Sequence, residues 1–381
     1  MILMLSKYIR YSLFFALVVL ISCKSVNDPD KNFLDDKFKE VKSEVKEARY
    51  FDLYRSTDMM KVVIHSPFGD GADQTLYLAD SEVYEKYKRY DGVIKVPLKR
   101  VAVLSSTQLY AVRLLGLLDA VQGVSDEKYI GDPVVKRYLK EGKITEVAVG
   151  GQFFTEKALM LGLDGIFFSP FNRDMNLKLD EKIPVIPFFD FMENTPLGRA
   201  EWIKFTAAFL GGQKKADLYF DSLSVRYNDL KKKALSRKKK PSVFSGRYLN
   251  GQWFVPGGKS YIARIFEDAG ADYIFSDDPS VNSVLLDFEV VFDRARNADY
   301  WRMTGGLDTD KDVYTFLAFE NELYTHFKAF KEHHIVYCDP QATGYFESGA
   351  LEPDVVLADF IAVFHEELLP GHILVYYRML H

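Results

Sequence analysis

The stretch "RVAVLSSTQLYAVRLLGLLDAVQGVSDEKY" (residues 100–129) decides the fold of this chain. A short apolar strand leads into small polar residues, and a helical apolar pattern follows before a second strand ends in Ser-Asp. A related stretch, "YIARIFEDAGADYIFSDDPS" (residues 261–280), repeats Tyr-x-x-Arg, the helical pattern, an Ala, a short strand and Ser-Asp at the same spacing. Alternating strands and helices favour a largely parallel sheet, so the repetition predicts two similar α/β lobes.

A second correspondence supports this duplication. "TEKALMLGLDGIFFS" (residues 155–169) and "FEVVFDRARNADYWRM" (residues 288–303) each place a glutamate, Glu156 or Glu289, at an expected helix start, followed by an Asp and an aromatic strand. The strands "VAVLSSTQ" and "QWFVPGGK" are expected to precede the first helix of each half. Chance similarity of common strand–helix segments is the alternative, but two matches in the same order favour duplication. The expected fold is α/β, with two Rossmann-like lobes joined by a long helix, a ligand cleft between the lobes and an extra N-terminal β-hairpin segment.

Periodicity and composition divide the chain into six parts. The run between the lobes has helical periodicity apart from a break at Gly211-Gly212, whereas the segment after Tyr50 alternates β-type runs with Gly and Asp turns. The expected parts are a signal peptide at 1–22, a flexible tether at 23–49, a β extension at 50–98, an N-terminal lobe at 99–194, a helical connector at 195–240 and a C-terminal lobe at 241–381.

The N-terminus carries an export signal that ends in a cysteine. Lys7 and Arg10 precede an apolar run that is too short to span a bilayer stably, and Leu20-Ile21-Ser22-Cys23 closes it. This last stretch resembles the lipobox of bacterial lipoproteins, in which the cysteine is acylated and becomes the first mature residue. An ordinary cleavage site with a cysteine nearby by chance is the alternative. We expect a periplasmic lipoprotein held to a membrane through Cys23, and the sequence does not indicate which membrane.

Composition and motifs argue against several classes of protein. The net charge of −5 gives no strong basic balance for nucleic acid. Cys338 lies in an apolar run and is expected to be a buried core cysteine rather than a nucleophile. "PGGKS" (residues 256–260) lacks the earlier glycine of a phosphate-binding loop, because Trp253 occupies that position. No nucleophile elbow, His-Glu-x-x-His or Cys-x-x-Cys motif occurs, so we expect neither catalytic residues, nor a protein-held metal, nor a cofactor.

From Arg100 to the C-terminus, the chain resembles the helical-backbone (class III) substrate-binding proteins of ABC importers for ferric siderophores, haem and cobalamin. The resemblance is carried by "RVAVLSSTQLYAVRLLGLLDAVQGVS", "TEKALMLGLDGIFFS", "GQWFVPGGKSYIARIFEDAGADYIFSDD" and "EPDVVLADFIAVFHEELLPGHILVYYRML", in that order. It implies a monomeric carrier that delivers a small-molecule metal chelate to an ABC permease and its ATPase. It also implies that Glu156 and Glu289 pair with permease arginines; a simple complement to each helix N-terminus is the other interpretation.

Aromatic residues in Gly-, Pro- and Asn-rich loops indicate the walls of a ligand pocket. The nominated wall residues are Phe153, Phe168, Phe171, Phe189, Trp253, Phe254, Trp301 and Tyr345. Three arginines, Arg173, Arg247 and Arg302, have the planar donor geometry that suits anionic groups of a ferric chelate, with surface ion pairing as the alternative. Cobalamin and haem are the alternative cargoes. An exported hydrolase and an adhesin are the alternative classes of function.

Overall fold

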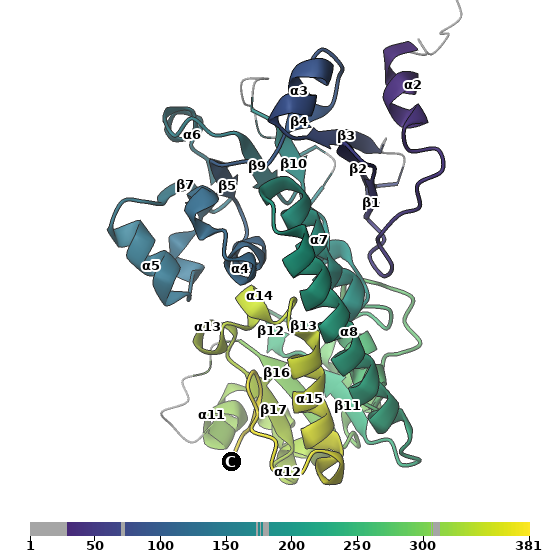
Figure 1. The fold of residues 1–381 in the computed structure, drawn as a ribbon. Helices are drawn as coiled ribbons and strands as arrows, with labels where there is room; N and C mark the ends of the chain where they lie inside the picture. Colours follow the sequence, from purple (N-terminus) through teal and green to yellow (C-terminus); the bar gives the residue numbers. More distant parts are fainter. Residues whose placement is uncertain are drawn as a thin grey trace, which may run out of the picture.

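The computed structural model describes residues 29–69, 73–172, 174–175, 177, 183–305, 307 and 313–381. The expected signal peptide and two expected functional residues, Cys23 and Arg173, lie outside these residues. Figure 1 shows two α/β lobes, one above the other, and an N-terminal extension on the outer side of the upper lobe. Within the described ranges, no helix combines the length and apolar character needed to cross a membrane.

The N-terminal extension is a four-stranded sheet with two helices, larger than the predicted β-hairpin segment. Strands β1, β2 and β3 are antiparallel neighbours, and β4 pairs parallel to β3 after helix α3. The elements are α2 (Pro29–Asp36), β1 (Phe51–Arg55), β2 (Met59–Ile64), β3 (Gln74–Ala79), α3 (Ser81–Tyr87) and β4 (Val93–Lys95). Side chains alternate between the two faces of β1, so Phe51 and Leu53 point into the core and pack with α7 of the first lobe.

Two buried glutamates on the first lobe hold the extension in place. Glu201 is fully buried and accepts hydrogen bonds from the backbone N–H groups of Lys46 (3.0 Å), Glu47 (2.7 Å) and Ala48 (3.0 Å). Glu193 accepts from the N–H groups of the next two residues, 49 and 50, at 2.9 and 3.1 Å. The predicted tether at 23–49 therefore differs from the structure, because its last part is fixed to the lobe and α2 lies within it.

The N-terminal lobe is built on a six-stranded sheet in the order β10-β9-β5-β6-β7-β8, parallel except for the β7–β8 pair. Its strands are β5 (Val101–Val103), β6 (Val121–Ser125), β7 (Thr145–Val149), β8 (Gln152–Phe153), β9 (Gly165–Phe168) and β10 (Val185–Pro187). Its α-helices are α4 (Ser106–Leu115), α5 (Pro133–Lys140) and α6 (Thr155–Met160), and its 3₁₀ helices are η1 (Leu118–Ala120), η2 (Glu127–Tyr129) and η3 (Asp190–Met192).

The connector is two helices rather than one. Helix α7 (Pro196–Leu210) begins with Thr195 accepting from the Gly198 N–H, and α8 (Gln213–Leu235) follows after the predicted break. Gly211 and Gly212 both have positive φ, +94° and +90°, a backbone conformation that glycine adopts without strain.

The C-terminal lobe contains a five-stranded sheet, order β14-β11-β16-β17-β18, and a three-stranded sheet, order β12-β13-β15. The strands are β11 (Ser242–Ser245), β12 (Tyr248–Leu249), β13 (Gln252–Pro256), β14 (Asp272–Tyr273), β15 (Ser283–Leu286), β16 (Tyr300–Thr304), β17 (Ile335–Cys338) and β18 (Arg378–Met379). The helices are α9 (Tyr261–Asp268), α10 (Phe288–Ala295), α11 (Val313–Glu320), η4 (Glu322–His326), α12 (Lys328–Lys331), α13 (Pro340–Thr343), α14 (Tyr345–Ser348), α15 (Pro353–Phe364) and η5 (Glu366–Leu368).

The two lobes repeat one arrangement, as the sequence similarity predicts. In the first lobe, β5 lies between β6 and β9; in the second, β11 lies between β14 and β16. Helix α4 joins β5 to β6 and α9 precedes β14, while α6 and α10 precede β9 and β16. "QWFVPGGK" forms strand β13, which precedes α9 as expected, but β13 belongs to the separate three-stranded sheet, and the counterpart of β5 is β11.

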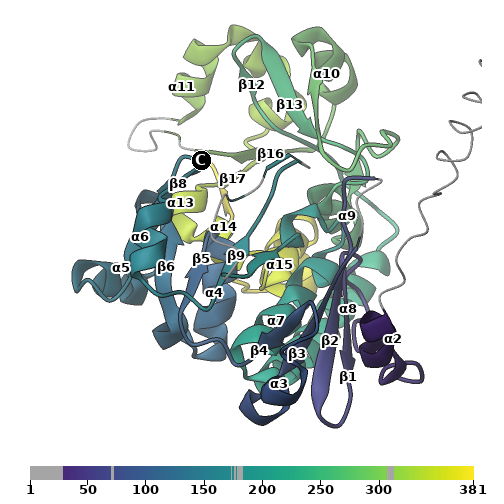
Figure 2. The ribbon, with the colours of Figure 1, turned by 90° about the horizontal axis from the view of Figure 1, so that it is seen from above.

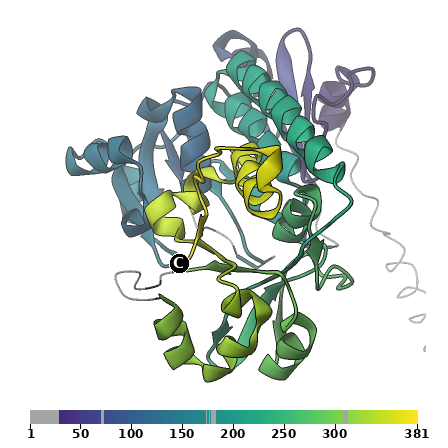
Figure 3. The same ribbon diagram turned by 90° about the horizontal axis from the view of Figure 1, so that it is seen from below.

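Helices also connect the hydrophobic cores of the lobes. One cluster of buried residues includes Leu115 and Ala200 from the first lobe together with Phe266 and Phe360 from the second. Figures 1 and 3 show α7, α8 and α15 packed side by side where the two lobes meet. The cleft between the lobes therefore has a packed helical back.

Candidate functional site

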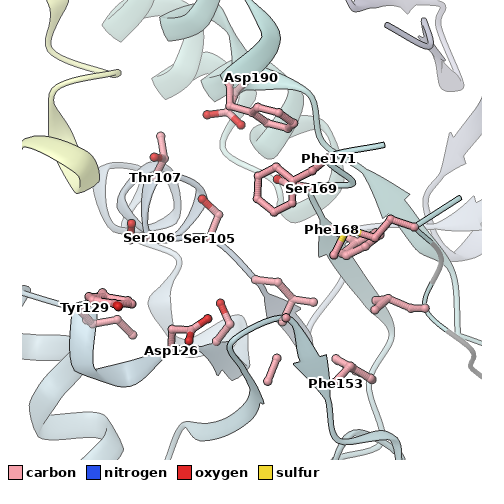
Figure 4. Close-up of a pocket in the computed structure, with 18 of the residues that line it drawn as sticks. Ser105, Ser106, Thr107, Asp126, Tyr129, Phe153, Phe168, Ser169, Phe171 and Asp190 are labelled. Carbon is pink, nitrogen blue, oxygen red and sulfur yellow. The ribbon is translucent and has the colours of Figure 1, made fainter. Parts of the chain in front are cut away.

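A cavity of about 300 Å³ lies where the strands of the N-terminal lobe end. Ser105, Ser106 and Thr107 follow β5 and begin α4, and Asp126 follows β6. Figure 4 shows these residues with the aromatic side chains of Phe168 and Phe171, which come from the end of β9 and the loop after it. The carboxyl ends of parallel strands meet at one sheet edge, and ligands of open α/β sheets bind there.

Two further hollows join this cavity to the C-terminal lobe. A hollow of about 380 Å³ shares Phe191 and Arg199 with the cavity and is lined on the other side by Tyr261, Arg302 and Tyr345. A second, of about 520 Å³, shares Ser106 and Tyr129 with the cavity and reaches the end of β17 at Asp339. Together they form the interlobe cleft, in which the strand ends of both lobes face one space.

Arg302 brings a nearly buried positive charge to the cleft. It lies on β16 with 9% of its surface exposed, and its guanidinium donates to the Tyr377 hydroxyl (3.0 and 3.2 Å) and to Ser245 Oγ (3.3 Å). Among the described residues, no carboxylate lies within ion-pairing distance of Arg302. An arginine stays charged when buried, so this side of the cleft favours an anionic group.

Arg199 brings a second positive charge from α7. Its guanidinium carbon lies 5.3 Å from the centre of the Tyr261 ring, and its Nε lies 3.8 Å from Asp190 Oδ2, beyond hydrogen-bonding distance. Burial raises the pKa of Asp190 and so favours its protonated, neutral form, which balances the charge of Arg199 less. Arg199 Nε itself has no hydrogen-bond partner among the described residues. Helical periodicity in the connector did not indicate that Arg199 reaches the cleft.

Helix α14 bridges the lobes at the edge of the cleft. Thr107 Oγ1 donates to the Phe346 carbonyl (2.8 Å), and the Gly131 N–H donates to the Glu347 carboxylate. The Tyr110 hydroxyl donates to Glu352 Oε1 at 2.6 Å. These contacts join α4 and the segment before α5 in one lobe to the C-terminal part of the other and fix the width of the cleft in this structure.

The structure brings five of the nominated ligand residues to this cleft. Phe153, Phe168 and Phe171 line the cavity, and Arg302 and Tyr345 line the adjoining hollow. The cleft also contains residues that the sequence analysis did not nominate. Among them are Tyr129, Asp126, Arg199 and Tyr261. Asp126 belongs to the Ser-Asp pair that recurs in both halves of the sequence. The repeat alone did not indicate that its side chain lines the cavity.

The remaining nominated residues lie elsewhere. Trp253 and Trp301 are fully buried in the core of the C-terminal lobe, where Trp253 Nε1 donates to the Ser245 carbonyl and Trp301 Nε1 to the Gly246 carbonyl. Their assignment to the pocket wall was wrong, because β13 directs Trp253 inward and Phe254 outward, and Trp301 lies in the buried part of β16. Phe189 is buried against Phe68, with ring centres 5.8 Å apart.

Phe254 and Arg247 also lie away from the cleft. Phe254 is 47% exposed on the three-stranded sheet, and Arg247 pairs with the Glu320 carboxylate. Neither residue lines any of the three hollows. The surface ion pair, which was the alternative interpretation of Arg247, is what the structure contains.

Glu156 and Glu289 occupy matching positions on the two lobes. Each is exposed in the first turn of its helix, α6 or α10. An acidic residue in a first helical turn is stabilised by the helix dipole, so the position agrees with both interpretations of these residues.

The motifs that were set aside have structural explanations. A side chain at Gly257 or Gly258 would come within 2.6 Å of backbone oxygens of the loop at 275–282, so these glycines allow two loops to pack together. Cys338 is buried as predicted, and burial raises the pKa of its thiol to about 11. In the described parts of the chain, no three His, Cys, Asp or Glu side chains gather to hold a metal ion.

Comparisons with known proteins agree with this architecture. The sequence model of the family described as "periplasmic binding protein" matches residues 101–342. An uncharacterized lipoprotein of Methanocaldococcus jannaschii is 31% identical over 297 residues, which cover 73% of this chain and 68% of the relative. Among solved structures, Helicobacter pylori CeuE with Ni(II) bound has a TM-score of 0.58 at 18% identity, covering 74% of this chain and 90% of that one.

A periplasmic haem-binding protein from Pseudomonas aeruginosa has a TM-score of 0.56 at 16% identity and covers 74% of this chain and 98% of that one. At these identities the solved structures establish the fold alone. The match to the family model covers more than half of the chain, and the two lobes with their helical connector are the fold of the helical-backbone class. The chain therefore belongs to the periplasmic binding protein family and is a binding protein rather than an enzyme.

Proposed function

We propose that this protein captures a ferric chelate in the interlobe cleft and delivers it to an ABC permease with its ATPase. The observation that carries the proposal is the combination of two cleft arginines, Arg199 and Arg302, with the aromatic walls formed by Phe168, Phe171 and Tyr345. A ligand with anionic groups and a broad apolar surface suits such a lining. Because the described residues offer no metal-ligating cluster, the metal would arrive inside its own chelator.

Haem and cobalamin are the competing cargoes. Haem is a candidate because a solved haem-binding protein has a similar fold. An axial haem ligand would have to come from Tyr129, Tyr261 or Tyr345, because no described histidine lines the three hollows. Cobalamin carries fewer anionic groups and would make less use of the two arginines. The arginines thus favour an anionic ferric chelate.

Ligand titration tests this choice. Purified protein would be titrated with ferric hydroxamate, ferric catecholate and ferric carboxylate chelates, haem and cobalamin, with absorbance of the coloured ligand as the readout. We expect one-to-one binding of an anionic ferric chelate. The variants Arg302→Met and Arg199→Met should each lower affinity about 10- to 100-fold, since a hydrogen bond to a charged group contributes about 1.5–3 kcal/mol.

Arg247→Met is the matched control, because it removes an arginine of the same lobe that lies outside the cleft. Its affinity should equal that of the unmodified protein. Equal affinities for all three variants, or tight binding of cobalamin alone, would contradict the proposal of an anionic chelate.

The proposed location is the periplasm, where acylated Cys23 holds the monomeric protein to a membrane. The lipobox-like "LISC" and the description of two Methanocaldococcus relatives as lipoproteins support the anchor. Metabolic labelling with an alkyne fatty acid should mark the protein, and Cys23→Ser should abolish the label. An equally labelled Cys23→Ser variant would place the acyl group elsewhere.

The proposed docking residues are Glu156 and Glu289. Both are exposed, and each lies on one lobe at an equivalent helix start. Replacing both with Lys should abolish uptake by cells while leaving ligand affinity unchanged, because paired permease arginines would meet like charges. The control reverses two other exposed glutamates, Glu40 and Glu267, and should leave uptake intact. Uptake that survives in the Glu156→Lys/Glu289→Lys protein would remove the docking role.

A further inference from the structure

The outer face of the N-terminal extension carries a cluster of aromatic rings, of which Phe33 is exposed and Tyr87 and Tyr90 are half-buried. Phe33 of α2 lies 6.4 Å from Tyr87 and 6.1 Å from Tyr90, and the two tyrosine rings lie 6.2 Å apart. Phe33 keeps 49% of its surface exposed, although a phenylalanine in a core would be fully covered. We call these three residues the aromatic face.

Two cations cover the edges of this face. Lys37 Nζ lies 5.0 Å from the centre of the Tyr87 ring, and the Arg89 guanidinium lies 4.9 Å from the centre of the Tyr90 ring. Arg89 also donates to the Tyr90 hydroxyl at 2.9 Å. Apolar rings with phenol and cationic groups at their rim are the composition that favours the boundary between water and lipid.

The aromatic face belongs to the side of the extension turned away from the rest of the protein. The inner side of the sheet, with Phe51 and Leu53, packs on α7, whereas Leu34, Phe38 and Tyr77 form a separate small core with α2 and α3. Figure 2 shows α7 and α8 between α2 and α3 on one side and strands β16 and β17 of the C-terminal lobe on the other. A partner of the aromatic face would therefore leave the cleft accessible.

The expected anchor lies close to this face along the chain. Five residues separate Cys23 from Pro29, where α2 begins, and the six steps from one Cα to the next span at most about 20 Å. If Cys23 carries acyl chains, α2 is confined to that distance from the lipid surface. The bilayer is thus the partner that the covalent connection brings to the aromatic face.

We propose that Phe33, Tyr87 and Tyr90, with Lys37 and Arg89 at their rim, rest in the headgroup region of the membrane that holds the anchor. This inference depends on the proposed acylation of Cys23. The rings bury apolar surface at the interface, and Arg89 reaches the lipid phosphates, whereas Lys37 Nζ stays in its ion pair with Asp58 Oδ2 at 2.8 Å. Because Glu193 and Glu201 fix the extension to the N-terminal lobe, contact at this face sets the orientation of that lobe over the membrane.

A tryptophan reporter tests the proposal. The chain has three tryptophans, all at most 1% exposed, so a new one at the surface can be distinguished from them. The variant Phe33→Trp would be acylated, purified and reconstituted into vesicles of phosphatidylcholine and phosphatidylglycerol, with or without brominated acyl chains. Phe319→Trp is the matched control, since Phe319 is 92% exposed on α11 of the far lobe. Vesicle flotation would report the anchor independently of the fluorescence.

The expected result is that both variants float and that only Phe33→Trp is quenched. One reporter among four tryptophans can lose at most about one quarter of the total emission when it lies within the headgroup and acyl boundary. Flotation of both proteins without quenching of Phe33→Trp, or equal quenching of the two, would overturn the membrane contact and leave the anchor standing. Failure of both to float would overturn the anchor and the membrane contact with it.

Discussion

Replacing Glu201 with glutamine should detach the start of the extension from the N-terminal lobe. Glu201 is fully buried and is the acceptor for the Lys204 ammonium (Nζ to Oε1, 2.8 Å) as well as for three consecutive backbone N–H groups at residues 46–48. Glutamine has nearly the same shape, so the change removes the charge and one acceptor oxygen without leaving a cavity.

The size of the effect follows from the groups left without a partner. Lys204 is 4% exposed and would lose the carboxylate that balances its charge, and breaking a buried pair from one side costs about 3–5 kcal/mol. The new amide N–H₂ would face at least one backbone donor, and an unsatisfied buried donor costs about 1–3 kcal/mol. Because these two costs overlap, we expect the free energy of unfolding to fall by about 4 kcal/mol.

Urea unfolding followed by circular dichroism measures the total loss, and hydrogen exchange read by mass spectrometry locates it. Exchange should accelerate first in peptides covering residues 44–55, before the strands of the lobe. Glu40→Gln makes the same chemical change at an exposed position and should alter the free energy of unfolding by less than about 0.5 kcal/mol. A loss below about 1 kcal/mol for Glu201→Gln, with unchanged protection at 44–55, would refute the role given to this carboxylate.

Three other predictions follow from buried or paired groups. Trp253→Ala should lower the free energy of unfolding by about 3–5 kcal/mol in a denaturant titration, because it empties a core position, and a change confined to ligand affinity would contradict the buried placement. Cys338, whose pKa burial raises to about 11, should resist a thiol reagent at pH 8 until the protein is unfolded, and fast labelling of native protein would count against this. Burial lowers the pKa of His65, but Asp52 and Asp73, at 3.0 and 2.8 Å, more than offset this and raise it above its usual value. The contribution of His65 to the free energy of unfolding is therefore present at pH 6 and is lost as pH rises through the raised pKa. The His65→Gln variant should show a smaller decline in the free energy of unfolding between pH 6 and 8.5 than the unmodified protein.

The repeated α/β arrangement was predictable because local sequence patterns determine its strands and helices. The small polar residues after β5 and the helical period from Tyr110 specify one strand–helix unit, and the same signs recur from Tyr261. The break at Gly211-Gly212 and the burial of Cys338 were likewise local properties. Such features can be predicted from sequence because they depend on neighbouring residues and not on distant ones.

The side chains that line the cleft were harder to predict because their placement depends on distant segments. Trp253 lies between Gly251 and Gly257, which suggested a loop, but a strand presents alternate residues to opposite faces and the sequence did not show which face is inward. Arg199 reaches the cleft only because α7 passes beside Tyr261 of the other lobe. The role of Glu201 required knowledge of the extension, whose backbone N–H groups it accepts.

The helical back of the cleft has a consequence for transport kinetics. Since α7, α8 and α15 pack between the lobes, a wide rotation of one lobe against the other would separate buried side chains, and we expect the spacing of Glu156 and Glu289 to change little when the cleft fills. An unloaded carrier would then offer the permease nearly the same surface as a loaded one. Unloaded molecules would act as competitors, and the import rate would depend on the loaded fraction of the carrier as well as on its abundance.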